Sequence, residues 1–241
     1  MSKKLIEICF VPEEFEGYFS GQEIVVVIDV LRATTAICSA LDFGVNKIIP
    51  VATVEEAKAY KAQGYFCAAE RNGQVLDDFE FGNSPIKIRS EKLKDQSLVI
   101  TTTNGTRAIK TASVAKQVII ASFMNLDAVC EYLIEQQKDV LIVGSGWKSQ
   151  FNLEDTICAG AIADKVLTNS NFSSDFDSTV AAKYLFRSAK DNIFGYLKSS
   201  SHRRRLRKLN LNEDIKFCLT ANQTSVLPVL INGEIVKLNT K

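Results

Sequence analysis

Histidine is almost absent from this chain, which has only His202 among its 241 residues. Sites that need two histidines are therefore excluded, among them zinc-protease pairs, two-metal histidine centres and phosphatases of the two-histidine type. The six cysteines are scattered singly and never form a C-x-x-C pair, so we interpret them as small buried hydrophobes in a reducing compartment. Chemistry in this protein must rest on carboxylates, hydroxyls, amides and arginines.

Long apolar runs and an excess of one charge are missing as well. No stretch approaches the roughly 18 apolar residues of a membrane span, and Glu7 with residues 12–14 interrupts any signal-peptide core. The 29 Lys and Arg residues nearly cancel the 28 Asp and Glu residues, which argues against a nucleic-acid or membrane-surface partner. We therefore expect a cytoplasmic protein that binds neither nucleic acid nor a membrane surface.

What the chain does contain is an alternation of short apolar runs with amphipathic stretches. The run from Ile24 to Ile28 is continuous and β-branched, which is typical of a strand buried on both faces. Thr53 and Glu56 form the pattern of a helix capping box. Further strands are predicted at 47–51, 65–69, 97–101, 117–121 and 139–143, and helices at 32–43, 53–61, 104–112, 125–137 and 154–167. This order predicts an α/β protein with a mostly parallel sheet covered by helices on both faces.

From about residue 170 the pattern changes. Asn232-Gly233 suits a type I′ turn and predicts a hairpin, and Pro228 in the first hairpin strand indicates an edge strand. The predicted segments are helices within 178–209 and hairpin strands at 226–231 and 235–238. We predict a single domain over 1–241, with 170–241 as its helical and hairpin extension.

Ligands of open parallel sheets bind beyond the carboxyl ends of the strands, so the polar residues after each apolar run are candidates. Asp29 ends the first buried run, and Arg32, Thr34 and Thr35 open the next helix. A helix N-terminus favours an anion, and a carboxylate at a strand end invites Mg²⁺. The alternative is that Asp29 only caps the helix and that both threonines are surface residues.

A second candidate group follows the strand predicted at 65–69. Glu70 and Arg71 are adjacent, and Asn83 lies near the end of the long connection that starts there. An acid beside an arginine would place a metal-binding and a phosphate-binding group side by side, whereas a surface ion pair is the alternative. The length of this glycine-containing connection favours a functional loop.

A dense run of hydroxyls follows the strand predicted at 97–101, and two acids begin the helix predicted at 154–167. The run offers hydroxyls, backbone N–H groups and a guanidinium to an anion, and comprises Thr102, Thr103, Asn104, Gly105, Thr106 and Arg107. An ordinary Asn-Gly turn is the alternative. The two acids, Glu154 and Asp155, either serve the helix dipole or complete a carboxylate cluster for a divalent cation.

Together these residues predict Mg²⁺-assisted phosphoryl chemistry on a small, highly anionic substrate. The candidate metal ligands are Asp29, Glu70, Glu154 and Asp155, and the candidate anion clamps are Arg32, Arg71 and Arg107. We expect Asp29, Glu70, Arg32 and Arg71 to be the catalytic residues. Leu31 stands where a haloacid dehalogenase has its second aspartate, which disfavours an aspartyl-phosphate mechanism of that type.

At these same stretches the sequence resembles the 2-phosphosulfolactate phosphatase family. The matching motifs are 28–35 (IDVLRATT), 69–73 (AERNG), 82–85 (GNSP), 101–107 (TTTNGTR) and 153–160 (LEDTICAG). The resemblance implies a three-layer α/β/α sandwich and a Mg²⁺-dependent phosphatase that converts 2-phospho-3-sulfolactate to 3-sulfolactate and phosphate, a step in coenzyme M biosynthesis. Arg203 and Asn210 stand where the family pattern has glycines.

The sequence leaves several alternatives open. The substrate is a small phosphorylated, sulfonated or carboxylated acid, and a related phosphorylated hydroxy acid is an alternative to phosphosulfolactate. A non-catalytic anion-binding regulatory protein is a further alternative, and the nucleophile is either water or a carboxylate. The basic run 202–208 is interpreted as a solvated helix end, with contacts to substrate, a second subunit or nucleic acid as alternatives. We also consider a homodimer.

Overall fold

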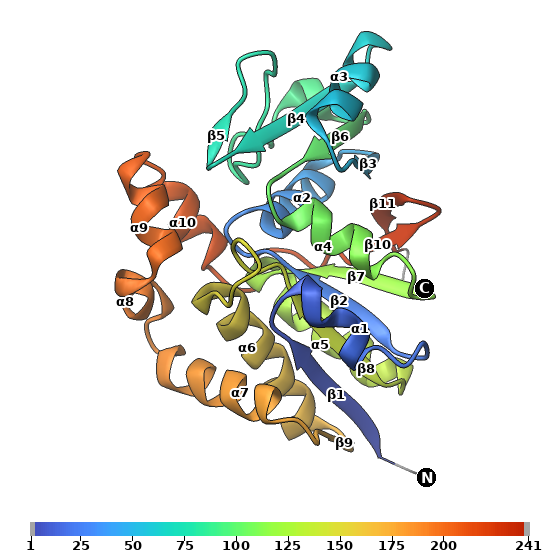
Figure 1. Ribbon diagram of the computed structural model, residues 1–241, viewed down its shortest axis with the longest axis vertical. Coiled ribbons are helices and arrows are strands. Elements are labelled where there is room, and N and C mark those ends of the chain that lie inside the picture. Colours follow the sequence, from blue (N-terminus) through green and yellow to red (C-terminus); the bar gives the residue numbers. More distant parts are fainter. Residues whose placement is uncertain (1–2, 239–241) are drawn as a thin grey trace.

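The computed structural model describes residues 3–238, which form a mixed sheet of eleven strands covered by helices on both faces (Figure 1). The predicted three-layer α/β/α sandwich is confirmed. The strands are β1 (Lys4–Cys9), β2 (Ile24–Ile28), β3 (Lys47–Pro50), β4 (Phe66–Arg71), β5 (Gln74–Val75), β6 (Ser97–Thr101), β7 (Gln117–Ala121), β8 (Val140–Gly144), β9 (Phe172–Ser173), β10 (Pro228–Ile231) and β11 (Glu234–Lys237). The α-helices are α1 (Phe15–Tyr18), α2 (Ala33–Phe43), α3 (Val54–Ala62), α4 (Gly105–Ala112), α5 (Leu126–Gln136), α6 (Leu153–Asn169), α7 (Asp177–Ala189), α8 (Ile193–Tyr196), α9 (Ser201–Lys208) and α10 (Asn212–Cys218).

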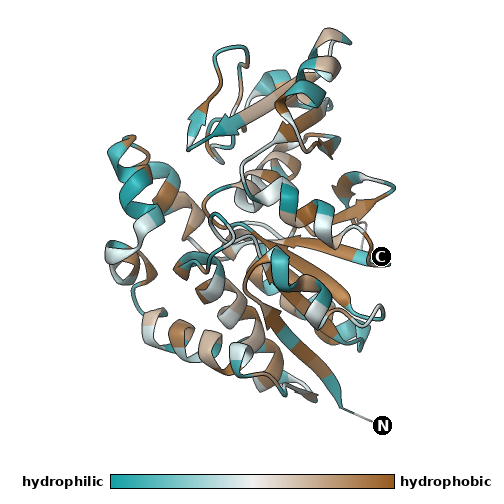
Figure 2. Ribbon diagram, in the orientation of Figure 1, coloured by the Kyte–Doolittle hydropathy of each residue, from teal (hydrophilic) through white to brown (hydrophobic). Residues whose placement is uncertain are grey.

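Strand β2 is buried along its whole length, as its continuous β-branched run predicts. Ile24, Val26 and Ile28 pack into the core that includes α5 and α6. Val25 and Val27 pack into the core that includes α2 and α4. Figure 2 shows β2 and its neighbour β7 largely in brown, the colour of hydrophobic residues. Because full burial of one such side chain contributes about 1.5–3 kcal/mol, the central strands anchor the polar residues at their ends.

The local signals before residue 170 are reproduced closely. Strands β2, β6 and β7 begin and end at the predicted residues. Thr53 Oγ1 accepts the N–H of Glu56 at 3.1 Å, and the Glu56 carboxylate accepts the N–H of Thr53, so the predicted capping box is confirmed. Gly44 ends α2 with a φ of 119°, a left-handed conformation that suits glycine.

The β10–β11 hairpin lies inside the sheet, between β7 and β3. The prediction of an edge strand is therefore wrong. Pro228 is the first residue of β10, where an interior strand tolerates the missing N–H. The predicted turn is confirmed, because Asn232 and Gly233 have φ values of 51° and 82°.

The hairpin joins two blocks of parallel strands. The β4 block contains β4, β6 and β3, and the β2 block contains β7, β2, β8, β1 and β9. The hairpin pairs antiparallel with β3 on one side and with β7 on the other. The sheet is thus mixed, as predicted, and two sets of parallel strand ends are available to one site.

Strand β1 was not predicted, because Glu7 interrupts its apolar pattern. It pairs with β8 and β9, and Glu7 lies in its buried half. The Glu7 carboxylate accepts the N–H of Asp175 at 2.9 Å and the hydroxyl of Ser174 at 3.2 Å, just before α7. Burial raises the pKa of Glu7 in spite of these hydrogen bonds. An acid can therefore belong to a buried strand when a neighbouring loop supplies its donors.

Residues 170–238 form β9, α7 to α10 and the hairpin. Helices α7 to α9 and the hairpin agree with the predicted segments, whereas β9 and α10 were not predicted. Helix α7 packs on α6 at Gly160, where a Cβ would lie 2.1 Å from the carbonyl oxygen of Ala182. A single domain over 1–241, with 170–241 as its extension, stays a prediction. All six cysteines are buried and free, as predicted. No helix within residues 3–238 combines the length and the apolar character needed to cross a membrane.

Candidate active site

One cavity lies where strands of both blocks end, and we call it the strand-end cavity. Its space measures about 480 Å³, the open mouth included. The lining residues are Asp29, Leu31, Arg32, Glu70, Asn72, Gly73, Asn83, Thr102, Thr103, Asn104, Trp147, His202, Arg205 and Leu206. In Figure 1 the arrowhead of β4 points toward the side of the molecule where α9, in orange, is found. Residues from distant parts of the sequence thus meet in one place.

Asp29 lies directly after β2 and is 6% exposed. Its Oδ1 accepts the N–H of Ala33 at 3.3 Å, and its own N–H donates to Thr34 Oγ1 at 2.9 Å. Gly105, the first residue of α4, packs so closely that a Cβ there would lie 2.8 Å from Asp29 Oδ2 and 2.4 Å from the Cβ of Ala33. This close approach requires glycine and brings the start of α4 to the carboxylate.

Glu70 lies near the end of β4 and is also buried. The chain turns back at Asn72 and Gly73, whose φ values are 55° and 86°. The N–H of Gly73 donates to Glu70 Oε1, and Asn83 Nδ2 donates to Oε2 at 3.3 Å. The turn and Asn83 therefore hold a second carboxylate beside the cavity that Asp29 lines.

Arg32 is held in place by the C-terminal helices and by the β4 turn. Its Nη1 lies 2.6 Å from Asp214 Oδ2 of α10, and its Nη2 donates to the carbonyl of Gly73 at 2.8 Å. Asp214 Oδ1 in turn accepts the hydroxyl of Ser84 at 2.8 Å. A guanidinium carries five N–H donors, so Arg32 keeps donors for an anion beyond these two contacts.

Three lining residues carry buried polar atoms that have no hydrogen-bond partner within residues 3–238. These atoms are Asn83 Oδ1, Thr103 Oγ1 and Arg205 Nη2. A buried polar atom without a partner costs free energy, so such atoms around a cavity indicate where a ligand completes the bonding. They extend the polar surface that Arg32 and the two carboxylates present.

His202 lines the cavity from α9 and is bound to a buried acid. Its Nδ1 lies 2.7 Å from Oε1 of Glu154, whose other oxygen accepts the hydroxyl of Ser200 at 3.2 Å. Burial by itself would lower the pKa of His202, but the hydrogen bond to Glu154 and the charges of Glu154 and Asp29 outweigh it and raise the pKa. Because Nδ1 is committed to Glu154, Nε2 is the nitrogen left for a ligand.

The acids around the cavity are buried and repel one another when they are ionised. Burial raises the pKa of Asp29 to about 6, and the charges of Glu70 and Glu154 add to this while His202 opposes it. Burial, followed by the charges of Asp29 and Glu154, raises the pKa of Asp155 to about 8. A bound cation would relieve this repulsion.

The structure keeps Asp155 out of the cavity lining. Its oxygens accept the N–H of Val30 at 2.8 Å, the hydroxyl of Ser145 at 2.9 Å and the amide of Asn152 at 2.8 Å. These donors tie the segment after β2 to the start of α6. Asp155 is thus placed to support the backbone beside Asp29.

The four predicted metal ligands do not form one cluster. No group of three or more His, Cys, Asp and Glu side chains in residues 3–238 is arranged to hold a metal ion. Glu154 is committed to α9, whereas Asp29 and Glu70 both line the cavity. Two carboxylates fit Mg²⁺, which keeps several waters and uses one or two carboxylates together with substrate phosphate oxygens.

Three predicted hydroxyls support the backbone outside the lining. Thr34 and Thr35 are fully buried, so the alternative that they are surface residues is wrong. Thr34 accepts the N–H of Asp29, and Thr35 donates to a carbonyl of the same turn at 2.9 Å. Thr106 donates to the carbonyl of Thr102 at 3.0 Å. All three hold the segments that carry the lining residues.

Two of the predicted anion clamps also lie outside the lining. Arg71 donates to the carbonyl of Glu70 at 2.7 Å and to the hydroxyl of Thr101 at 3.2 Å. Arg107 pairs with Glu13 at 2.6 Å. Arg71 is thus bound to the protein itself, whereas Arg107 is bound only through Nη1, and its buried Nε and Nη2 have no partner within residues 3–238. Neither residue lines the strand-end cavity.

The inner face of α9 forms a wall of the cavity that sequence reasoning missed. Its lining residues, His202, Arg205 and Leu206, have the i, i+3, i+4 spacing of one helix face. The interpretation of 202–208 as a solvated helix end is wrong for this face and holds for Arg204 and Arg207, which are exposed. The i, i+3, i+4 spacing of these three residues was the sequence signal that could have predicted a shared helix face.

A second cavity of about 1170 Å³ lies between α3, α4 and the hairpin. Of the predicted site residues, Thr106 alone lines it. Its acids serve the fold, because Glu56 belongs to the α3 capping box and Glu234 pairs with Lys47 at 2.6 Å. The chemistry therefore favours the smaller strand-end cavity as the site.

The protein is a three-layer α/β/α sandwich whose cavity sets buried acids against guanidinium, hydroxyl and amide groups, a donor set that suits phosphoryl chemistry on an anionic substrate. A family model described as 2-phosphosulpholactate phosphatase matches residues 9–233. The chain therefore belongs to the 2-phosphosulfolactate phosphatase family and is a phosphoric monoester hydrolase.

Relatives from three bacteria agree with this assignment, and each is named a probable 2-phosphosulfolactate phosphatase. The protein of Caldanaerobacter subterraneus subsp. tengcongensis is 40% identical over 213 residues, which cover 87% of this chain and 88% of the relative. That of Thermotoga maritima is 42% identical over 208 residues, covering 86% and 89%. That of Clostridium acetobutylicum is 37% identical over 214 residues, covering 88% and 91%. The resemblance seen in the motifs is confirmed.

Proposed function

We propose that this phosphatase hydrolyses 2-phospho-3-sulfolactate to 3-sulfolactate and phosphate with Mg²⁺ as its cofactor. The observation that carries the proposal is the presence of two buried carboxylates, Asp29 and Glu70, in one cavity with guanidinium, hydroxyl and amide donors. The family match and the names of the relatives support this substrate. Such a product would place the protein in coenzyme M biosynthesis.

The two carboxylates have the role of holding the cation in this proposal. Asp29 and Glu70 would bind Mg²⁺, which neutralises phosphate oxygens and activates water when it is bound. Arg32 and Thr103 donate to the phosphate oxygens, and Arg32 is fixed for this by Asp214. Asp29 orients the attacking water, because it lies where the start of α4 meets the cavity.

His202 supplies the proton that the leaving oxygen needs. Its raised pKa favours the protonated ring, and Glu154 fixes the ring through Nδ1. A positioned acid of this kind typically contributes about 10²- to 10⁴-fold to a rate. Glu154 therefore acts through His202 and does not need to contact the substrate.

Phosphate release tests the proposal directly. We expect release from 2-phosphosulfolactate that stops with a chelator and returns when Mg²⁺ is added. Release that is unaffected by the chelator would contradict the role of the cation. A higher kcat/KM for 2-phospholactate or phosphoglycerate would identify a related hydroxy acid as the substrate, and no release from any of them would favour a non-catalytic anion-binding protein.

We also propose a cytoplasmic location, no nucleic-acid partner and a homodimeric assembly. The net charge of +1 supports the absence of a nucleic-acid partner. Sedimentation equilibrium at micromolar concentration measures the assembly, and a monomer would contradict the dimer.

A further inference from the structure

Arg205 is a lining guanidinium for which the proposed mechanism has no role. It lies on α9, one turn after His202, and its Cζ is 4.0 Å from the centre of the Trp147 ring. Its Nη2 is buried and has no hydrogen-bond partner within residues 3–238. No salt bridge of this described part of the chain includes Arg205.

Other arginines near the cavity are bound within the protein. Arg32 is paired with Asp214. Arg203 lies with its Cζ 3.8 Å from the centre of the Phe194 ring and donates to the carbonyl of Phe194. Arg205 thus differs from its neighbours in presenting a buried, unsatisfied N–H group to a ligand cavity.

The surroundings of Arg205 leave its positive charge incompletely balanced. Burial lowers the pKa of Arg205, and the charge of Glu154 opposes this only in part. The indole face of Trp147 covers the plane of the guanidinium, so its edge remains for hydrogen bonds. A carboxylate or sulfonate is the group that such an edge binds best, through charge-assisted hydrogen bonds.

The phosphate has other partners in the cavity. Arg32, Thr103 and the cation held by Asp29 and Glu70 account for it in the proposed mechanism. The esters that this family model and the relatives' names point to carry at least one further anionic group beside the phosphate. Arg205 is the guanidinium of the lining that the proposed mechanism leaves without a role, and its positive charge suits that group.

We propose that Arg205, held on the face of Trp147, binds the second anionic group of the substrate, its carboxylate or its sulfonate. Through this contact Arg205 selects phosphate esters of acids over phosphate esters of neutral alcohols. Trp147 acts as a positioning residue, because it contacts the guanidinium and fixes its plane. This inference rests on the proposed function.

Three esters that differ by one anionic group at a time test Arg205. Isopropyl phosphate carries neither group, 2-phospholactate carries the carboxylate, and 2-phosphosulfolactate carries both. We expect Arg205→Gln to lower kcat/KM about 10- to 100-fold for the acidic esters and to leave isopropyl phosphate near its wild-type value. A loss on both acidic esters identifies the carboxylate as the partner, and a loss on 2-phosphosulfolactate alone identifies the sulfonate.

Arg204→Gln is the matched control, because Arg204 is the exposed neighbour on the same helix. We expect this variant to keep the wild-type kcat/KM for all three esters. Equal losses on all three esters in Arg205→Gln would overturn the proposal, since Arg205 would then bind the phosphate or only support the fold. Unchanged values for the acidic esters would overturn it as well.

Binding of the product separates this inference from the proposed function. Trp147 is the only tryptophan of the chain, so its fluorescence reports directly on Arg205. We expect 3-sulfolactate to change the fluorescence saturably in the wild type and in Arg204→Gln, and not in Arg205→Gln. This result supports the inference even if no ester is hydrolysed, whereas the same change in Arg205→Gln, or no change in the wild type, overturns it.

Discussion

The two walls of the strand-end cavity differ in charge and in origin. The strand-end wall contains Asp29 and Glu70, which lie directly after or near the end of buried strands. The helix wall is the inner face of α9 and contains His202 and Arg205. In the proposed mechanism the acids that bind the cation thus face the guanidinium that selects the substrate, and His202 on the helix wall supplies a proton. The comparison teaches that cation binding and substrate selection are placed on separate elements.

The two walls are held together by contacts between α9, α10 and the β4 turn. Gly73 in that turn packs against α9 so closely that a Cβ would lie 2.8 Å from the side chain of Leu209 and 3.2 Å from that of Leu206. Asp214 of α10 binds Arg32 of the strand-end wall. The position of the helix wall therefore depends on tertiary packing, and that of the strand-end wall on the pairing of the sheet.

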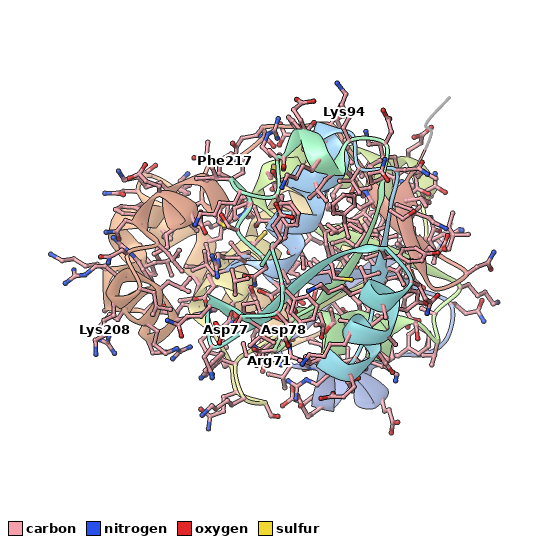
Figure 3. All side chains as sticks on the ribbon, turned by 90° about the horizontal axis from the view of Figure 1, so that it is seen from above. Arg71, Asp77, Asp78, Lys94, Lys208 and Phe217 are labelled. Carbon is pink, nitrogen blue, oxygen red and sulfur yellow. The ribbon has the colours of Figure 1, made fainter. Side chains whose placement is uncertain are left out.

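Removal of the Asp29 charge is the largest perturbation that we expect for activity. Asp29→Asn should lower kcat about 10²- to 10⁴-fold with the fold intact by circular dichroism, because it removes a cation ligand and the group that orients water. Asp77→Asn is the control, since Asp77 is exposed in the connection after β5 and is labelled in Figure 3. Full Mg²⁺-dependent turnover in Asp29→Asn would break the assignment of chemistry to the strand-end wall.

Loss of the ion pair between the strand-end wall and α10 should be the largest perturbation of stability. Asp214→Ala leaves the buried Arg32 without its acid and should lower the free energy of unfolding by about 3–5 kcal/mol. Urea unfolding measures the change. Glu213→Ala is the control, because its exposed pair with Lys216 is worth about 1 kcal/mol or less. Equal losses in the two variants would mean that Asp214 does not fix α10 to the strand-end wall.

The pH dependence of stability measures the charge imbalance of the buried titratable groups around the strand-end cavity. Asp29, Asp155 and His202 all have raised pKa values, so the folded protein holds protons that the unfolded chain has already released. Their contribution is complete below their unfolded pKa values and is lost as pH rises through the folded ones, about 6 for Asp29 and about 8 for Asp155. We expect the Tm of the metal-free protein to fall between about pH 5 and pH 8.5.

Asp29→Asn sharpens this measurement, because it removes one of the titrating groups. The variant should show a flatter decline of Tm with pH than the wild type. A Tm that rises over this range in the wild type would contradict the charge balance. If Tm declines with pH in the variant as steeply as in the wild type, groups other than Asp29 cause the pH dependence of stability.

The smallest effect is expected at Arg71, which the sequence predicted to be catalytic. Its guanidinium is bound to Glu70 and Thr101 outside the lining, so Arg71→Gln should change kcat/KM much less than Arg205→Gln. Steady-state kinetics with 2-phosphosulfolactate compares the two variants. A loss at Arg71 that exceeds the loss at Arg205 would move substrate binding back to the strand-end wall.

The strand-end wall was predictable because its signals are local. A continuous β-branched run marks β2, and an acid directly after such a run lies at a strand end wherever the strand is placed. Thr53 and Glu56 specify their capping box within four residues. Glu7 escaped prediction because the donors that satisfy it come from the loop before α7.

The helix wall was not predictable in the same way, because its role follows from packing. A basic run has the same composition whether a helix faces solvent or a cavity, and in α9 it does both (Figure 3 shows Lys208 at the periphery of the molecule). Asn210, just before α10, adopts a left-handed φ of 58°, a conformation that asparagine tolerates better than most residues.

A crystal structure of Asp29→Asn with Mg²⁺ and 2-phosphosulfolactate is the most direct test of a single cavity that joins both walls. We predict that the phosphate lies against Arg32 and Thr103, with a carboxylate or sulfonate oxygen on Arg205. A substrate bound instead in the cavity between α3, α4 and the hairpin would contradict the account.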